Sequence, residues 1–86
     1  MKVVIVEDEQ AAARRLQRLL ESENLIVLAT LHSLKSAVDW FKQHEAPDLI
    51  FLDIQLSDGL SFSIFDQVQI ESPIIFTTAY DEYALQ

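Results

Sequence analysis

Short apolar runs alternate along the chain with segments in which apolar residues recur every three or four positions. Uninterrupted runs rich in Val, Ile and Leu are typical of strands buried on both faces of a sheet. Such runs predict four strands, which cover Val3 to Val6, Leu25 to Leu31, Leu49 to Leu52 and Ile74 to Phe76. The first, third and fourth runs end at acidic or hydroxyl residues. Polar side chains that could take part in chemistry therefore lie at the ends of predicted strands.

The segments between these runs have the spacing of amphipathic helices. The first predicted helix covers Gln10 to Glu21, and its arginines lie mostly off the apolar stripe. A second begins after Ser33, a residue type that commonly caps helix N-termini, and is closed by His44 to Pro47. The third follows a turn at Ser57 to Gly59. Its apolar side is predicted to consist of Leu60, Ile64, Phe65 and Val68.

Strand and helix patterns therefore alternate three times with short connections. This order predicts βαβ units with right-handed crossovers, and hence an α/β protein with a parallel sheet and helices on both faces. Eighty-six residues are enough for one such domain, residues 1–86, and too few for a second hydrophobic core.

The charged residues are predominantly acidic and give the chain a formal net charge of −8. This balance argues against a nucleic-acid-binding surface, because phosphate backbones are held mainly by Lys and Arg. The chain has no cysteine, which excludes thiolate metal sites and thiol nucleophiles and fits a reducing compartment. The apolar run after Met1 ends at Glu7, too early for a signal peptide or a membrane span. We therefore expect a cytoplasmic protein.

Acidic residues follow two of the predicted strands, and a hydroxyl follows a third. Glu7 and Asp8 come after the first strand, Asp53 after the third, and Thr78 at the end of the fourth. Ligands of open parallel sheets bind beyond the carboxyl ends of the strands, so these side chains are expected to meet at one rim. All six Lys and Arg residues lie within the first 42 positions, which leaves few cations to neutralise the cluster. Carboxylate oxygens without His or Cys favour Mg²⁺.

Three strand-end segments together resemble the receiver domain of bacterial two-component response regulators. They are Val3 to Glu9, Asp48 to Ile54 and Ile75 to Ala79, and their spacing matches the family as well as their composition. The segment Asp53 to Gly59, with Phe76 to Tyr83, resembles the receivers that precede LytTR-type (LytR/AlgR) DNA-binding domains. The resemblance implies a doubly wound, flavodoxin-like sheet with its strands in the order 2-1-3-4.

The same resemblance implies a function for the acidic rim. Asp53 would accept a phosphoryl group from a phosphohistidine on a sensor histidine kinase, and Thr78 would hydrogen-bond the phosphoryl oxygens. Mg²⁺ would be held by Glu7, Asp8, Asp53 and the backbone carbonyl of Gln55. A carboxylate is a competent nucleophile toward phosphorus, and a metal ion offsets the charge of the transferred group. The domain would relay the signal to an output domain, expected to bind DNA and regulate transcription, and would not itself be an enzyme.

Receivers continue into a fifth strand and a last helix, whereas this sequence ends at Gln86. The fifth strand of the family carries a Lys that pairs with the phosphoryl group, and no Lys or Arg follows Lys42 here. We therefore expect a receiver that is incomplete at its C-terminus. The fourth strand, Ile74 to Thr78, would then form an uncovered apolar edge, and such edges favour self-association, here into a dimer.

Two alternatives from other functional classes stay open at this point. A receiver-like interaction or dimerisation module would share the fold without being phosphorylated in this form. A phosphatase-like enzyme with an Asp nucleophile would require a second acid two residues after Asp53, where Gln55 stands instead. His32 and His44 have no ligand-spaced partner and are predicted to be ordinary surface histidines, and Trp40 is predicted to be half-buried by packing.

Overall fold

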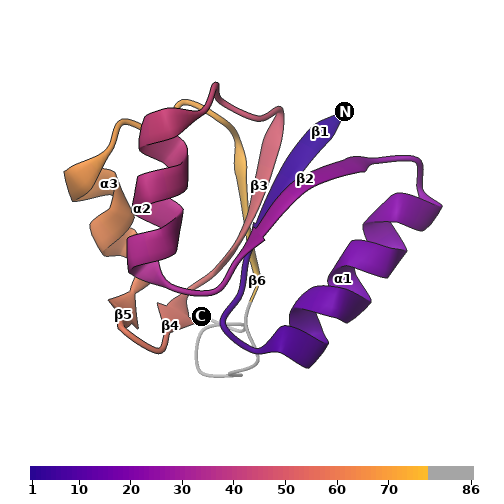
Figure 1. Cartoon of the computed structure of the whole chain (residues 1–86), viewed down its shortest axis with the longest axis horizontal. Coiled ribbons are helices and arrows are strands. Elements are labelled where there is room, and N and C mark those ends of the chain that lie inside the picture. The colour runs from indigo at the N-terminus through magenta and orange to yellow at the C-terminus, as the bar shows by residue number, and fades with distance from the viewer. Residues whose placement is uncertain (78–86) are drawn as a thin grey trace.

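Four strands form a parallel sheet at the centre of the molecule (Figure 1). The computed structural model describes residues 1–77. The four strands of this sheet are β1 (Lys2–Val6), β2 (Ile26–Leu31), β3 (Leu49–Asp53) and β6 (Ile74–Thr77). They are hydrogen-bonded in the order β2-β1-β3-β6, and each neighbouring pair is parallel. This confirms the predicted α/β, doubly wound architecture and the strand order 2-1-3-4.

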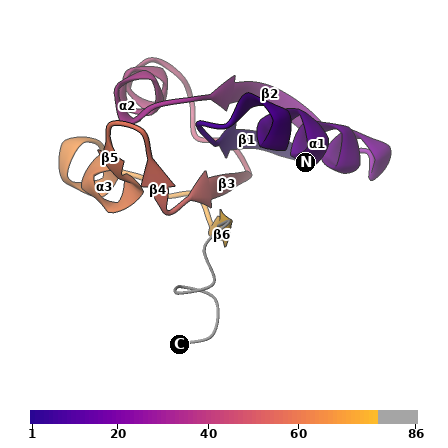
Figure 2. The same ribbon diagram turned by 90° about the horizontal axis from the view of Figure 1, so that it is seen from below.

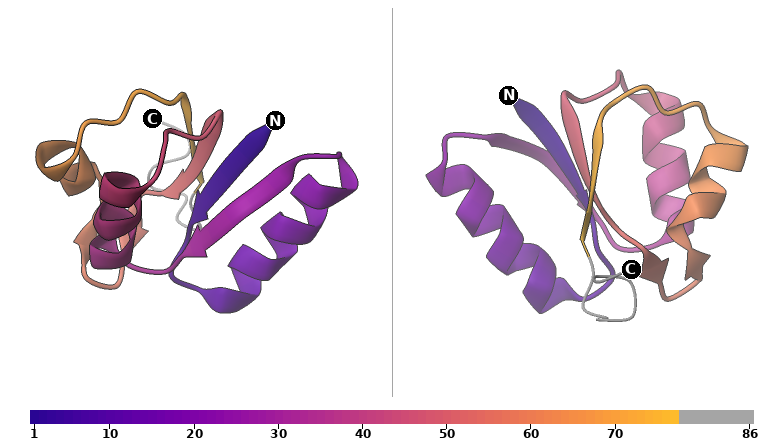
Figure 3. Two further views of the ribbon diagram at one scale, coloured as in Figure 1. Left: turned by 45° about the horizontal axis from the view of Figure 1, so that its top comes forward. Right: turned by 180° about the vertical axis from the view of Figure 1, so that it is seen from behind.

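Helices cover both faces of the sheet, as Figures 2 and 3 show. They are α1 (Gln10–Ser22), α2 (Leu34–Gln43) and α3 (Ile64–Gln67). The α1 side of the core contains Val3 and Ile5 of β1, and the α2 and α3 side contains Val4 and Val6. All four residues are fully buried, because β1 lies between β2 and β3 and is covered from both sides. None of the helices in residues 1–77 has the length and apolar character needed to cross a membrane.

The start of α2 follows the sequence prediction. Ser33 is its N-cap residue, and the Ser33 Oγ accepts the backbone N–H of Ser36 at 3.1 Å. The Ser36 Oγ accepts the backbone N–H of Ser33 in return, at 3.2 Å, which completes a capping box. Near the other end of the helix, Trp40 is half-buried as predicted, and its ring stacks on the exposed His44 ring with centroids 4.2 Å apart.

The segment after Asp53 differs from the prediction. A turn leading directly into a helix that carries Leu60 was expected, but the chain first forms an antiparallel hairpin and then a 3₁₀ helix. The additional elements are β4 (Gln55–Leu56), β5 (Gly59–Leu60) and η1 (Ser61–Ser63). The helix α3 begins only at Ile64 and is four residues long. As a result Ile64 is buried, whereas Leu60 and Phe65 of the expected apolar side are exposed.

Backbone contacts of the hairpin explain this difference. Gly59 has a φ of +139°, and a Cβ at this position would lie 2.9 Å from the Leu34 Cδ1, so only glycine fits the turn. The Ser61 N–H donates to the Ile54 carbonyl at 2.8 Å, which returns the chain to the end of β3 before the helix can start. The hairpin is thus held between α2 and β3.

Asp58 fastens the tip of the hairpin to the N-terminus of α2. Its Oδ1 accepts the backbone N–H of Leu34 at 2.8 Å, and its Oδ2 accepts that of Lys35 at 3.3 Å. The hydrogen bond from Leu34 is the main reason why the pKa of the Asp58 carboxyl is lowered. A helix N-terminus has N–H groups without partners inside the helix, and Asp58 supplies acceptors for two of them.

Candidate functional site

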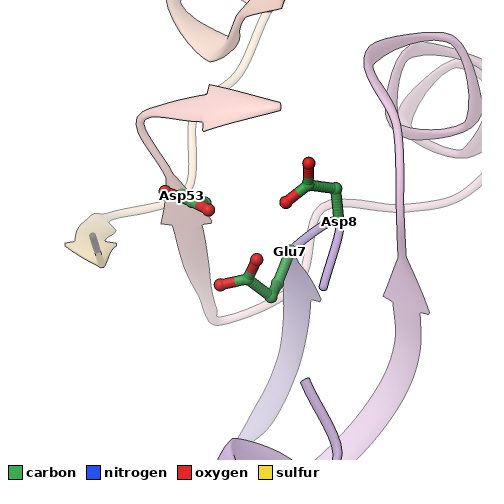
Figure 4. A group of neighbouring side chains, drawn as sticks. All are labelled: Glu7, Asp8 and Asp53. Carbon is green, nitrogen blue, oxygen red and sulfur yellow. The ribbon is translucent and has the colours of Figure 1, made fainter. Parts of the chain in front are cut away.

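The carboxyl ends of β1 and β3 bring three acids together at one rim of the sheet. Glu7 and Asp8 directly follow β1, and Asp53 is the last residue of β3. These strands are parallel neighbours in which Val6 lies opposite Leu52, so their ends are level. Figure 4 shows the three side chains around a common space. One carboxylate oxygen from each lies within 4.8 Å of the other two, as expected from the sequence.

Burial differs among the three carboxylates. Asp53 is only 6% exposed, whereas Glu7 and Asp8 are half-buried. The Asp53 Oδ1 is buried and has no hydrogen-bond partner. A buried carboxylate oxygen without a partner costs free energy unless a cation or a donor approaches it. The Asp53 carboxylate therefore lies deepest in the site and has a free acceptor.

Burial and the neighbouring acids both affect the pKa of Glu7. The pKa of the Glu7 carboxyl is raised to about 7, mainly because burial disfavours its charged form and further because the Asp53 carboxylate is near. The Glu9 N–H, which donates to the Glu7 Oε2 at 3.0 Å, offsets part of this effect. Within residues 1–77 the one ion pair joins Lys35 to Asp39, so the three acids have no described Lys or Arg partner.

The donor set fits a hard divalent cation. Octahedral Mg²⁺ binds oxygen at about 2.0–2.1 Å, which places neighbouring ligands about 3 Å and opposite ligands about 4 Å apart. One oxygen from each carboxylate lies within 4.8 Å of the other two, and the unpartnered Asp53 Oδ1 lacks the contact that a cation would supply. A site with carboxylates and without His or Cys favours Mg²⁺ over softer metal ions. Glu7, Asp8 and Asp53 are thus suitable Mg²⁺ ligands.

The structure does not test the roles of two of the predicted site residues. Gln55 lies in β4, two residues after Asp53, with its side chain exposed, and the role of its backbone carbonyl stays a prediction. Thr78 lies outside the described residues, so its predicted hydrogen bond to a phosphoryl group also stays a prediction.

The prediction that His32 is an ordinary surface residue is wrong. His32 follows β2 and is half-buried, and its Nδ1 lies 2.8 Å from the backbone carbonyl oxygen of Glu7. The position of His32 directly after β2 could have indicated this contact, because β2 ends at the same rim as its parallel neighbour β1. Ligand spacing along the chain does not reveal a contact between residues that follow two neighbouring strands.

The parallel sheet with helices on both faces places this α/β domain in the doubly wound class, whose ligands bind beyond the carboxyl ends of the strands. Within this class the chain belongs to the response regulator receiver domain family, whose family model matches residues 3–86. The family predicted from the three strand-end segments is therefore confirmed.

Relatives and solved structures agree with this assignment. The chain is 39% identical over 90 residues to the sensory transduction protein LytT of Bacillus cereus, covering 100% of this chain and 36% of the relative. It is 37% identical to LytT of Bacillus subtilis, again over 90 residues, covering 100% and 37%. The chain thus spans about a third of the length of these curated relatives.

Structural similarity extends to receiver domains from other bacteria. The response regulator PhyR from Brucella abortus superposes with a TM-score of 0.83 at 26% identity, covering 99% of this chain and 36% of that one. The N-terminal domain of a response regulator/sensory box/GGDEF protein from Carboxydothermus hydrogenoformans gives a TM-score of 0.82 at 29% identity, covering 100% and 70%.

Proposed function

We propose that this chain is a phosphoacceptor module, in which Asp53 accepts a phosphoryl group from a phosphohistidine of a sensor histidine kinase. The observation that carries the proposal is the Asp53 Oδ1, which is buried, has no partner and belongs to a carboxylate beside Glu7 and Asp8. Glu7, Asp8, Asp53 and the Gln55 carbonyl are the proposed Mg²⁺ ligands. Membership in the receiver family supports the same assignment.

The chemistry requires one nucleophilic oxygen and compensation of charge. A carboxylate oxygen of Asp53 attacks phosphorus, the P–N bond to the kinase imidazole breaks, and the ring nitrogen leaves with the electron pair and takes up a proton. When bound, Mg²⁺ offsets negative charge on the phosphoryl oxygens. Glu7 and Asp8 would hold the cation near the nucleophile, and the buried position of Asp53 at the end of β3 restricts its side chain. Thr78 is the proposed hydrogen-bond donor to the phosphoryl group.

The signal is proposed to pass to an output domain that binds DNA and regulates transcription. The relatives named LytT are sensory transduction proteins about three times as long as this chain, which leaves room for such a domain in them. With a net charge of −8, this domain itself is poorly suited to bind nucleic acid, whose phosphates are also negative. A cytoplasmic location belongs to the same proposal, because a chain without cysteine fits a reducing compartment.

A second candidate function, self-association through β6, is favoured by a separate observation. In the part of the chain that the structure describes, β6 pairs with β3 only, and Ile75 and Phe76 are 47% and 44% exposed. No charged residue lies within Ile74–Thr77, so this strand itself has no charge to oppose pairing with another strand. This alternative is an interaction or dimerisation module that shares the receiver fold without being phosphorylated in this form.

Phosphorylation by a small donor tests the leading proposal. Incubation of the chain with acetyl phosphate and Mg²⁺ is expected to add one phosphoryl group, detected by intact-mass spectrometry and mapped to the peptide that contains Asp53. The same incubation with EDTA in place of Mg²⁺ is the control and is expected to give no adduct. Absence of an adduct in the presence of Mg²⁺, or an adduct mapped to another residue, would contradict the proposal.

A further inference from the structure

Glu7 has its backbone held on both sides by two consecutive residues of the neighbouring strand end. Its N–H donates to the Leu31 carbonyl at 2.8 Å, and its own carbonyl lies 2.8 Å from the His32 Nδ1. A carbonyl oxygen has no hydrogen to give, so the Nδ1 of His32 carries the proton and donates. The ring is thereby held with hydrogen on Nδ1.

A register shift in the sheet places His32 at this position. The pairing of β1 with β2 runs Lys2 to Ile26 and Val3 to Val27, and then skips one residue so that Val4 faces Ala29. The extra residue is a bulge, and it brings Leu31 opposite Val6. Without the bulge Thr30 would face Val6, and Leu31 would stand where His32 now meets Glu7. Bulges near functional sites commonly redirect one side chain in this way.

We propose that His32 is a positioning residue for the acidic site. The Glu7 carbonyl belongs to the peptide plane that joins Glu7 to Asp8, so its direction sets ψ of Glu7 and φ of Asp8. The hydrogen bond from His32 fixes that plane and with it the directions in which both carboxylates leave the chain. This inference rests on the proposed Mg²⁺ site, because its consequence is a preorganised pair of ligands.

The test compares Mg²⁺ affinity among variants of the 86-residue chain. His32→Leu keeps the bulk and removes the donor, and it is expected to raise the Kd for Mg²⁺ about tenfold, the lower end of the effect of removing a hydrogen bond that orients a metal ligand. His32→Asn places an amide Nδ2–H where the Nδ1–H was, and it is expected to restore the Kd to within roughly threefold of wild type. Titration with MgCl₂, followed by the NMR amide signals of Asp8 and Glu9, measures these values.

His44 offers a matched control. Its Nδ1 lies 2.9 Å from the Trp40 carbonyl oxygen, so His44→Leu removes the same kind of hydrogen bond at a place remote from the three acids. A purely structural role for His32 would make the two leucine variants alike in Mg²⁺ affinity once both are shown to be folded. We expect the Kd to be unchanged in His44→Leu. The ¹⁵N signals of the His32 ring should also show hydrogen on Nδ1 in the wild-type chain.

The outcomes separate this inference from the proposed function. If wild type binds Mg²⁺ and His32→Leu binds it equally well, the positioning role is wrong while the metal site stands. A His32 ring protonated on Nε2 alone would overturn the positioning role in the same way. If wild type does not bind Mg²⁺ at all, the proposed function fails and this inference fails with it.

Discussion

Millimolar Mg²⁺ is expected to raise the melting temperature of the chain by several degrees at pH 8 and by much less at pH 5. A ligand that binds only the folded state stabilises it by mass action, by about 2.7 kcal/mol at one hundred times its Kd. At pH 8, above the pKa of Glu7, the Glu7 carboxylate is available to the cation. At pH 5 the ion must first displace a proton from Glu7, whose pKa is about 7 in the folded chain.

The metal-free chain should show the opposite dependence on pH. The pKa of Glu7 is raised from 4.5 to about 7 on folding, so its contribution to stability is fully present below pH 4.5 and is lost as the pH rises through 7. Glu7 is partly exposed and water screens its neighbours, so the expected loss is about 1 kcal/mol, or about 4–8 °C in melting temperature for a domain of this size. Thermal unfolding in EDTA between pH 5 and pH 8 measures this contribution.

Substitutions at the acidic rim test whether the stabilisation by Mg²⁺ and the pH dependence of the metal-free chain both arise there. Glu7→Gln cannot ionise and should remove the fall in melting temperature between pH 5 and pH 8, while Glu9→Gln, an exposed neighbour, should keep it. Asp8→Ala should abolish the response to Mg²⁺. A response to Mg²⁺ that survives in Asp8→Ala, or that is equal at pH 5 and pH 8 in wild type, would place the ion elsewhere.

The main features of the site followed from the sequence because the chemistry of a parallel sheet depends on where its strands end. Four apolar runs predicted the strands to within one or two residues, and the acids after the first and third of them met as expected. The pairing of β1 with β3, which makes them meet, came from the family resemblance, because alternation alone gives no strand order.

The remaining features depend on single backbone contacts that no periodicity reveals. The hairpin after Asp53 exists because Gly59 adopts a positive φ and the Ser61 N–H returns to Ile54, and both are tertiary effects on a segment that has a helical pattern. The contact of His32 with Glu7 depends on a bulge in β2, and one extra residue in a strand leaves the apolar pattern unchanged. The pattern of apolar residues therefore predicts the strands and helices. The conformation near the site depends on individual hydrogen bonds that this pattern does not reveal.

Asp53→Asn is expected to abolish the phosphoryl adduct and, at the same time, to stabilise the metal-free chain by about 1 kcal/mol. The amide is not a nucleophile toward phosphorus under these conditions, so the adduct disappears. The gain in stability has a different cause, since the substitution removes a buried negative charge from beside Glu7 and Asp8. The new amide N–H groups can also donate to a neighbouring carboxylate, which the original carboxylate could not do.

Asp48→Asn is the matched control, because it makes the same substitution just before β3 rather than at its end. The Asp48 Oδ2 accepts the backbone N–H of Lys2 at 2.7 Å, a hydrogen bond that an amide makes less strongly than a carboxylate. This variant should keep the adduct and lose a little stability, the reverse of Asp53→Asn on both measurements. Intact-mass spectrometry measures the phosphoryl adduct, and chemical denaturation in EDTA measures the free energy of unfolding. An adduct in Asp53→Asn would remove Asp53 as the acceptor, and a loss of stability in that variant would show that its carboxylate is satisfied in the folded chain by contacts other than a cation.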